Sequence, residues 1–94
     1  MLIVRGINLF PSSIENIVRR FDGVNEFVVE VYREREMDEM EIRIESALSD
    51  TARLAQAIQH EVHLGMGFRP RVTVAPAGTL PRFELKARRV FDKR

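Results

Sequence analysis

The fold is decided by residues 26–45, which read EFVVEVYREREMDEMEIRIE. Residues 26–33 are rich in β-branched and aromatic side chains, a composition typical of a strand. Met40, Ile42 and Ile44 then alternate with charged residues, as in an antiparallel strand with one face in water. The intervening residues 33–38 are almost all charged and predict a hairpin. The stretch therefore predicts two antiparallel strands, with the glutamates of residues 39–45 on the solvent face.

A helix is predicted before this hairpin. Ser12 and Glu15 have the spacing of a capping box, Pro11 stands where the helix begins, and Gly23 is expected to end it. The apolar residues that share one face of this helix are Ile14, Ile17, Val18 and Phe21.

A second helix is predicted after the hairpin. Ser49, Asp50 and Thr51 are candidate N-caps, and Gly65 and Gly67 are expected to end the helix. Its apolar residues share a face and are Leu54, Ala55, Ile58 and Val62.

The two ends of the chain complete the pattern. Residues 2–10 form an apolar run that predicts a buried strand with a kink or bulge at Arg5 and Gly6. Residues 71–75 predict the last core strand, and a basic tail follows in which Val90 and Phe91 are the apolar anchors. The order β-α-β-β-α-β predicts an α+β, ferredoxin-like antiparallel sheet with two helices on one face and a C-terminal basic tail.

The composition excludes several classes of protein. Ninety-four residues suffice for one modest core, 45% of the residues are hydrophobic, and no apolar run approaches a membrane span. The chain has no cysteine and starts without a leader pattern, so a cytoplasmic setting is expected. The net charge is +1, and the basic residues concentrate after Pro81 while the remainder is acidic, which argues against binding to nucleic acid.

Most polar residues have an ordinary explanation. His60 and His63 are three residues apart on the second helix, but without a third ligand they are interpreted as a solvated pair and not as a zinc site. Two segments are less ordinary: residues 4–15, VRGINLFPSSIE, and residues 78–89, GTLPRFELKARR. A β-bulge before a helix cap and a solvated terminus are the structural alternatives for these two segments.

Together the two segments resemble the signature motifs of the C-terminal domain of AMP-forming acyl-CoA synthetases, with wording nearest to the phenylacetate-CoA ligase branch. MLIVRGINLFPS, residues 1–12, resembles the motif after the hinge of that family. GTLPR, residues 78–82, with Lys86 and Arg89 resembles its closing lysine motif. The resemblance implies a lid domain that swings between two steps, in which a carboxylate first reacts with ATP to give an acyl-adenylate and CoA then displaces AMP.

The resemblance also implies roles for three residues. Lys86 would enter the site during adenylation, where its ammonium neutralises charge on the carboxylate and the α-phosphoryl group. Gly6 would border the CoA channel and Arg5 would bind CoA phosphates, although Arg5 could instead pair with a glutamate of the sheet. The sequence departs from the family at Leu85, where glycine is usual.

The resemblance further implies a large N-terminal domain ahead of Met1, which would supply the ATP and acid pockets. The expected substrates of the intact enzyme are ATP (together with Mg²⁺), CoA and an aryl acid such as phenylacetate. None of these ligands is expected to bind to the 94 residues alone. The isolated chain is expected to be inactive, and two copies could pair through an exposed sheet edge or face. The alternative function is a stand-alone ferredoxin-like regulatory module that binds a small ligand.

Overall fold

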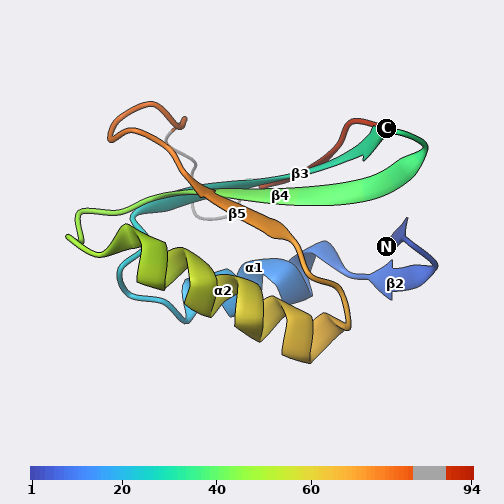
Figure 1. The fold of residues 1–94 in the computed structure, drawn as a ribbon, viewed down its shortest axis with the longest axis horizontal. Helices are drawn as coiled ribbons and strands as arrows, with labels where there is room; N and C mark the ends of the chain where they lie inside the picture. Colours follow the sequence, from blue (N-terminus) through green and yellow to red (C-terminus); the bar gives the residue numbers. More distant parts are fainter. Residues whose placement is uncertain (82–88) are drawn as a thin grey trace.

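The computed structural model describes residues 1–81 and 89–94. This part of the chain forms α1 (Pro11–Arg19), α2 (Thr51–Met66) and the strands β1 (Leu2–Val4), β2 (Ile7–Leu9), β3 (Glu26–Glu34), β4 (Met37–Glu45), β5 (Arg71–Val74) and β6 (Val90–Asp92). Both helices lie on the same face of the sheet formed by β3 to β6 (Figure 1). The prediction of an α+β fold with two helices on one face is confirmed.

The sheet has the strand order β5-β4-β3-β6. β3 and β4 form the predicted hairpin, in register from Glu26 opposite Glu45 to Glu34 opposite Met37. β5 runs parallel to β4, and β6 runs parallel to β3. The sheet is therefore mixed where an antiparallel sheet was expected, because α2 carries the chain back across the sheet before β5 starts, as a parallel connection requires.

The N-terminal run is a hairpin and not the predicted single strand with a bulge. β1 pairs antiparallel with β2, with Val4 opposite Ile7, and the two strands form a separate small sheet. The chain reverses because Arg5 and Gly6 both have positive φ angles, of 50° and 76°. The fourth strand of the main sheet comes instead from the predicted basic tail, where β6 buries Val90 beside β3.

The start of α1 also differs from the prediction. Its N-cap is Phe10, and no side chain caps the helix, so the capping box of Ser12 and Glu15 is wrong. The proline after Phe10 fixes φ at the first helical position and starts the helix ahead of the serine. The helix ends at Arg19, before Gly23.

The ends of α2 agree with the sequence pattern. Asp50, one of the three candidate N-caps, accepts a hydrogen bond from the Arg53 backbone N–H at 3.0 Å. Gly67 ends the helix in the left-handed conformation, with φ of 72°. None of the helices in the described part of the chain is long and apolar enough to cross a membrane.

One core joins both helices to the sheet and to the N-terminal hairpin. Its buried members are Val4, Leu9, Ile14, Ile17, Val18, Phe27, Val29, Val31, Met40, Ile42, Ile44, Leu54, Ile58, Val62, Phe68 and Val90. The hairpin of β1 and β2 is therefore packed onto the domain through Val4 and Leu9, which fixes the position of the turn between its strands.

Candidate functional site

The turn between β1 and β2 presents Arg5 and Gly6 at the surface. Two residues link the strands, and positive φ at both is the geometry of a type I′ turn, which matches the twist of a hairpin. A Cβ atom placed on Gly6 would have no heavy atom within 4 Å. The domain itself therefore leaves the space beside Gly6 open, and the backbone conformation is what requires glycine.

Arg5 is held by three contacts. Its Nε donates to the Asp38 carbonyl oxygen at 2.9 Å, and its Nη2 donates to Glu39 Oε1 at 2.5 Å. Its guanidinium lies 5.2 Å from the ring centroid of Phe68, within cation–π range. Arg5 therefore pairs with a glutamate of the sheet, which was the alternative to a CoA-binding role, and it ties the turn to β4.

A charged cluster lies beside this turn. Arg94 donates to the Ile3 carbonyl oxygen at 2.5 Å and to Asp38 Oδ2 at 3.0 Å. Arg94 also holds the pKa of Asp92 at about 2 by hydrogen bonding to its carboxylate. Burial acts to raise the pKa of Asp38, but hydrogen bonds from Arg33 and Arg5, with the charge of Arg94, lower it overall. The cluster joins the C-terminal end of the chain to the N-terminal hairpin.

Lys86 lies outside the described residues, as does Leu85. On the upstream side of residues 82–88, Pro76 accepts hydrogen bonds from the Thr79 backbone N–H at 3.2 Å and from the Thr79 hydroxyl at 2.5 Å. Gly78 has a φ of 80° and donates its N–H to the Glu45 carboxylate. Leu80 is buried. This loop and the Arg5–Gly6 turn lie toward opposite ends of the domain (Figure 1).

On the downstream side, Arg89 is buried, with 7% of its surface exposed. Its guanidinium forms an ion pair with Glu26 and lies 4.8 Å from the centroid of the Phe27 ring. Its backbone N–H donates to Glu15 Oε1 at 3.3 Å, and its carbonyl accepts from the Val29 N–H at 2.8 Å. Arg89 is thus fixed both by its backbone and by its side chain.

The electrostatic surroundings of Arg89 contain both signs of charge. Burial lowers the pKa of Arg89, and the nearby positive charge of Arg19 lowers it further, while Glu15 acts to raise it. Because the ordinary pKa of an arginine lies far above neutral pH, the guanidinium stays charged near neutral pH and keeps its ion pair with Glu26.

The other polar residues singled out from the sequence fall elsewhere. Glu45 is buried, with 2% of its surface exposed, so its predicted place on the solvent face is wrong. His60 is exposed and His63 is partly buried. In residues 1–81 and 89–94, no three histidine, cysteine or acidic side chains gather closely enough to hold a metal ion.

Comparison with known families places the chain. The family described as AMP-binding enzyme C-terminal domain matches residues 6–94, nearly the full length. The chain belongs to this family. The match includes Gly6 at its start and the whole stretch from Gly78 to Arg89, as the resemblance of the two segments implied.

Curated relatives of this AMP-binding enzyme C-terminal domain include phenylacetate-coenzyme A ligases from Escherichia coli, at 32% identity, and Pseudomonas putida, at 31%. Each alignment covers the whole chain but 23% of the relative, so the chain spans about a quarter of their length. A solved domain of phenylacetate-coenzyme A ligase from Bacteroides vulgatus has a TM-score of 0.84 at 28% identity, covering 100% of this chain and 92% of that one.

The domain also matches a 2-hydroxyisobutyryl-CoA ligase solved in two states. In the thioesterification state, with 2-HIB-AMP and CoA, the TM-score is 0.85 at 28% identity, covering 98% of this chain and 21% of that one. In the postadenylation state, with 2-HIB-AMP, the TM-score is 0.79 at 30% identity, covering 100% and 22%. Domains of this kind therefore occur in ligases that form an acyl-adenylate and bind CoA.

The sequence did not predict that three glutamates contact the described residues of the lysine motif. Glu15 was assigned to a helix cap, Glu45 to the solvent face, and Glu26 only to a strand. Their partners, Gly78 and Arg89, are distant in sequence, so no local pattern could reveal the contacts. The available signal was that residues 26–45 begin and finish with a glutamate, because the register of a hairpin places its first and last residues opposite one another.

Proposed function

We propose that this domain is the C-terminal lid of an ATP-dependent, AMP-forming aryl acid-CoA ligase of the phenylacetate-CoA ligase type. The observation that carries the proposal is the similarity of this whole chain to part of the phenylacetate-coenzyme A ligases, together with the match of residues 6–94 to the family. The complete enzyme would convert an aryl acid such as phenylacetate, ATP and CoA into the acyl-CoA, AMP and pyrophosphate.

The lid would work with a large N-terminal adenylate-forming domain of the same cytoplasmic enzyme. That domain would hold ATP, its Mg²⁺ and the acid, because the chain spans about a quarter of the length of its curated relatives. The lid would contribute one surface to each half-reaction. The separation of the Gly78 loop from the Arg5–Gly6 turn supports this division, since the two lie toward opposite ends of the domain (Figure 1).

Lys86 is proposed as the catalytic residue of adenylation. A carboxylate that attacks the α-phosphoryl group brings two negatively charged groups together, and an ammonium placed between them stabilises the transition state. Such an interaction in a site closed to water is worth about 3–4 kcal/mol. The described residues on either side of this segment, Gly78 and Arg89, contact the buried carboxylates of Glu45 and Glu26, which supports a functional role for this part of the domain.

The first prediction tests this role in the full-length enzyme. Lys86→Ala should slow adenylation about 100-fold or more, measured as acid-dependent pyrophosphate exchange, because the ammonium acts in that transition state. Conversion of supplied acyl-adenylate to the thioester should stay near the wild-type rate.

Lys93→Ala is the matched control for this prediction. Lys93 lies in the same basic tail but forms an ion pair with Glu30 on β3, so both half-reactions should be retained. Equal loss of both half-reactions in Lys86→Ala, or unchanged adenylation, would contradict the assigned role.

The Arg5–Gly6 turn is proposed to border the CoA channel during thioester formation. The open space beside Gly6 supports this placement, because a narrow pantetheine arm could pass close to a backbone without a Cβ. Arg5 would add a positive charge near the CoA phosphates, in competition with its present ion pair to Glu39.

A further inference from the structure

Two buried glutamates face each other at one end of the β3–β4 hairpin. Glu26 and Glu45 are opposite in the strand register and have 7% and 2% of their surfaces exposed. Like charges directly opposite on neighbouring strands destabilise a sheet, and burial of a carboxylate adds a desolvation cost. The pair therefore requires compensating donors.

The Phe27 backbone N–H donates to Glu26 at 3.1 Å, and two further donors come from the flanks of residues 82–88. Glu45 accepts a hydrogen bond from the Gly78 N–H on the upstream side. Glu26 forms its ion pair with Arg89 on the downstream side. One pair of facing carboxylates thus holds the chain both before and after the segment that carries Lys86.

Further contacts restrict each flank. The Arg89 N–H donates to Glu15 on α1, and its carbonyl accepts from Val29 on β3. Leu80 is buried on the upstream side. Both described flanks are therefore joined to the sheet or the core, and Arg89 also contacts α1.

We propose that Glu26 and Glu45 are positioning residues for adenylation, because they hold Arg89 and Gly78, the described residues on either side of the segment that carries Lys86. This inference rests on the proposed role of Lys86. The glutamates do not touch the reacting groups; they act through the lysine. A displacement of a catalytic group by about 1 Å can cost a factor of 100 in rate.

The test uses the full-length ligase and measures the two half-reactions separately. Glu45→Met removes the acceptor of the Gly78 N–H, and the double change Glu26→Met with Arg89→Met removes both charges of the ion pair together, so that neither of them is left buried without the other. Each should lower the kcat of adenylation about 10- to 100-fold, with the KM for ATP and the rate of thioester formation unchanged.

Glu30→Met is the matched control. Glu30 is as buried as Glu26 and lies on the same strand. Its ion pairs are with Arg43 and Lys93, and neither of these residues flanks the segment that carries Lys86. It should leave adenylation unchanged. A loss in Glu30→Met equal to that in the other two variants would overturn the proposal, because burial of charge alone would then explain it.

Combination with Lys86→Ala separates positioning from general stability. If the glutamates act through the lysine, Glu45→Met should cause no further loss of adenylation once Lys86 is alanine. If the losses of adenylation from Glu45→Met and Lys86→Ala add fully in the double variant, the positioning role is overturned. Normal adenylation in both glutamate variants, while Lys86→Ala is impaired, would also overturn the positioning role and leave the proposed function standing. Normal adenylation in Lys86→Ala itself would instead overturn the proposed function.

Discussion

Gly6 combines a demanding backbone conformation with open space. Its φ of 76° suits glycine, and any other residue except asparagine or aspartate is strained there. The strain depends little on the size of the new side chain, whereas obstruction of a neighbouring channel depends on it strongly. Size therefore distinguishes a turn that only shapes the hairpin from a turn that borders CoA.

The second prediction uses this difference in the full-length enzyme. Gly6→Ala and Gly6→Phe should strain the turn similarly, but Gly6→Phe should slow thioester formation much more than Gly6→Ala while adenylation is retained in both. The measurement is the rate of CoA-dependent thioester formation from supplied acyl-adenylate. Equal rates for the two variants would argue that no channel passes beside Gly6.

Arg5 can be tested through its partner. A third prediction is that Arg5→Met raises the KM for CoA several-fold, because it removes a positive charge near the CoA phosphates, whereas Glu39→Gln leaves the KM unchanged or lowers it by releasing Arg5. Both changes break the same ion pair. Similar kinetics in the two variants would show that Arg5 acts only within the domain.

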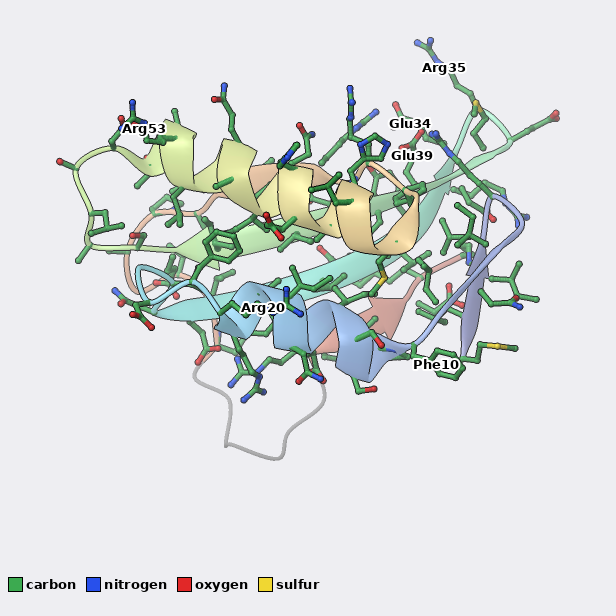
Figure 2. All side chains as sticks on the ribbon, turned by 90° about the horizontal axis from the view of Figure 1, so that it is seen from below. Phe10, Arg20, Glu34, Arg35, Glu39 and Arg53 are labelled. Atoms are coloured by element: carbon green, nitrogen blue, oxygen red, sulfur yellow. The ribbon has the colours of Figure 1, made fainter. Side chains whose placement is uncertain are left out.

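At the scale of elements, the β3–β4 hairpin carries a local conflict. Its two-residue turn places Arg35 and Glu36 at φ angles of 51° and 65°, although such turns favour asparagine and glycine. Arg35 stands at the outer tip of this hairpin, away from the helices (Figure 2). Continuous pairing of β3 with β4 leaves Arg35 and Glu36 as the two turn residues, although neither residue type favours a positive φ angle.

A fourth prediction follows for stability. The double change Arg35→Asn with Glu36→Gly should raise the free energy of unfolding by about 1 kcal/mol. It relieves the backbone strain at two residues with positive φ, and the glycine adds only a small entropy cost on folding. Urea denaturation of the 94-residue chain is the measurement. Alanine at both positions keeps the strain and should give no gain, and an equal gain with alanine would contradict the explanation.

The elements that the sequence predicted correctly are those defined by local pattern. The alternation of residues 40–44 specified β4, and Asp50 with Gly67 specified the ends of α2. A kink or bulge was predicted at Arg5 and Gly6, but the complete reversal of the chain was missed, because arginine is uncommon at positive φ. β6 was missed because Val90 pairs with β3 only through the tertiary fold.

The candidate site was predictable only as a pair of motifs. Local sequence led to Arg5, Gly6 and Lys86 through their resemblance to a family, and it offered a glutamate of the sheet as the alternative partner of Arg5. It could not identify that partner as Glu39, nor connect Glu26 to Arg89, because both contacts join residues far apart in the chain.

For the whole molecule, the fifth prediction is that these 94 residues alone show no acid-dependent pyrophosphate exchange. Residues 6–94 match the family of C-terminal domains, and the chain spans about a quarter of the length of its curated relatives. Adding the N-terminal domain of the same enzyme should be required for activity. Exchange above background by the isolated domain, at saturating ATP and phenylacetate, would refute the division of labour between the domains.

The contact of Arg94 with the Ile3 carbonyl has a practical consequence for the architecture of the chain. The two ends of the chain lie on the same side of the molecule (Figure 1). A domain whose ends lie on one side can be inserted into an exposed loop of a host protein through two short spacers. We therefore expect this domain to fold as an insertion in a host protein as well as at the end of a fusion.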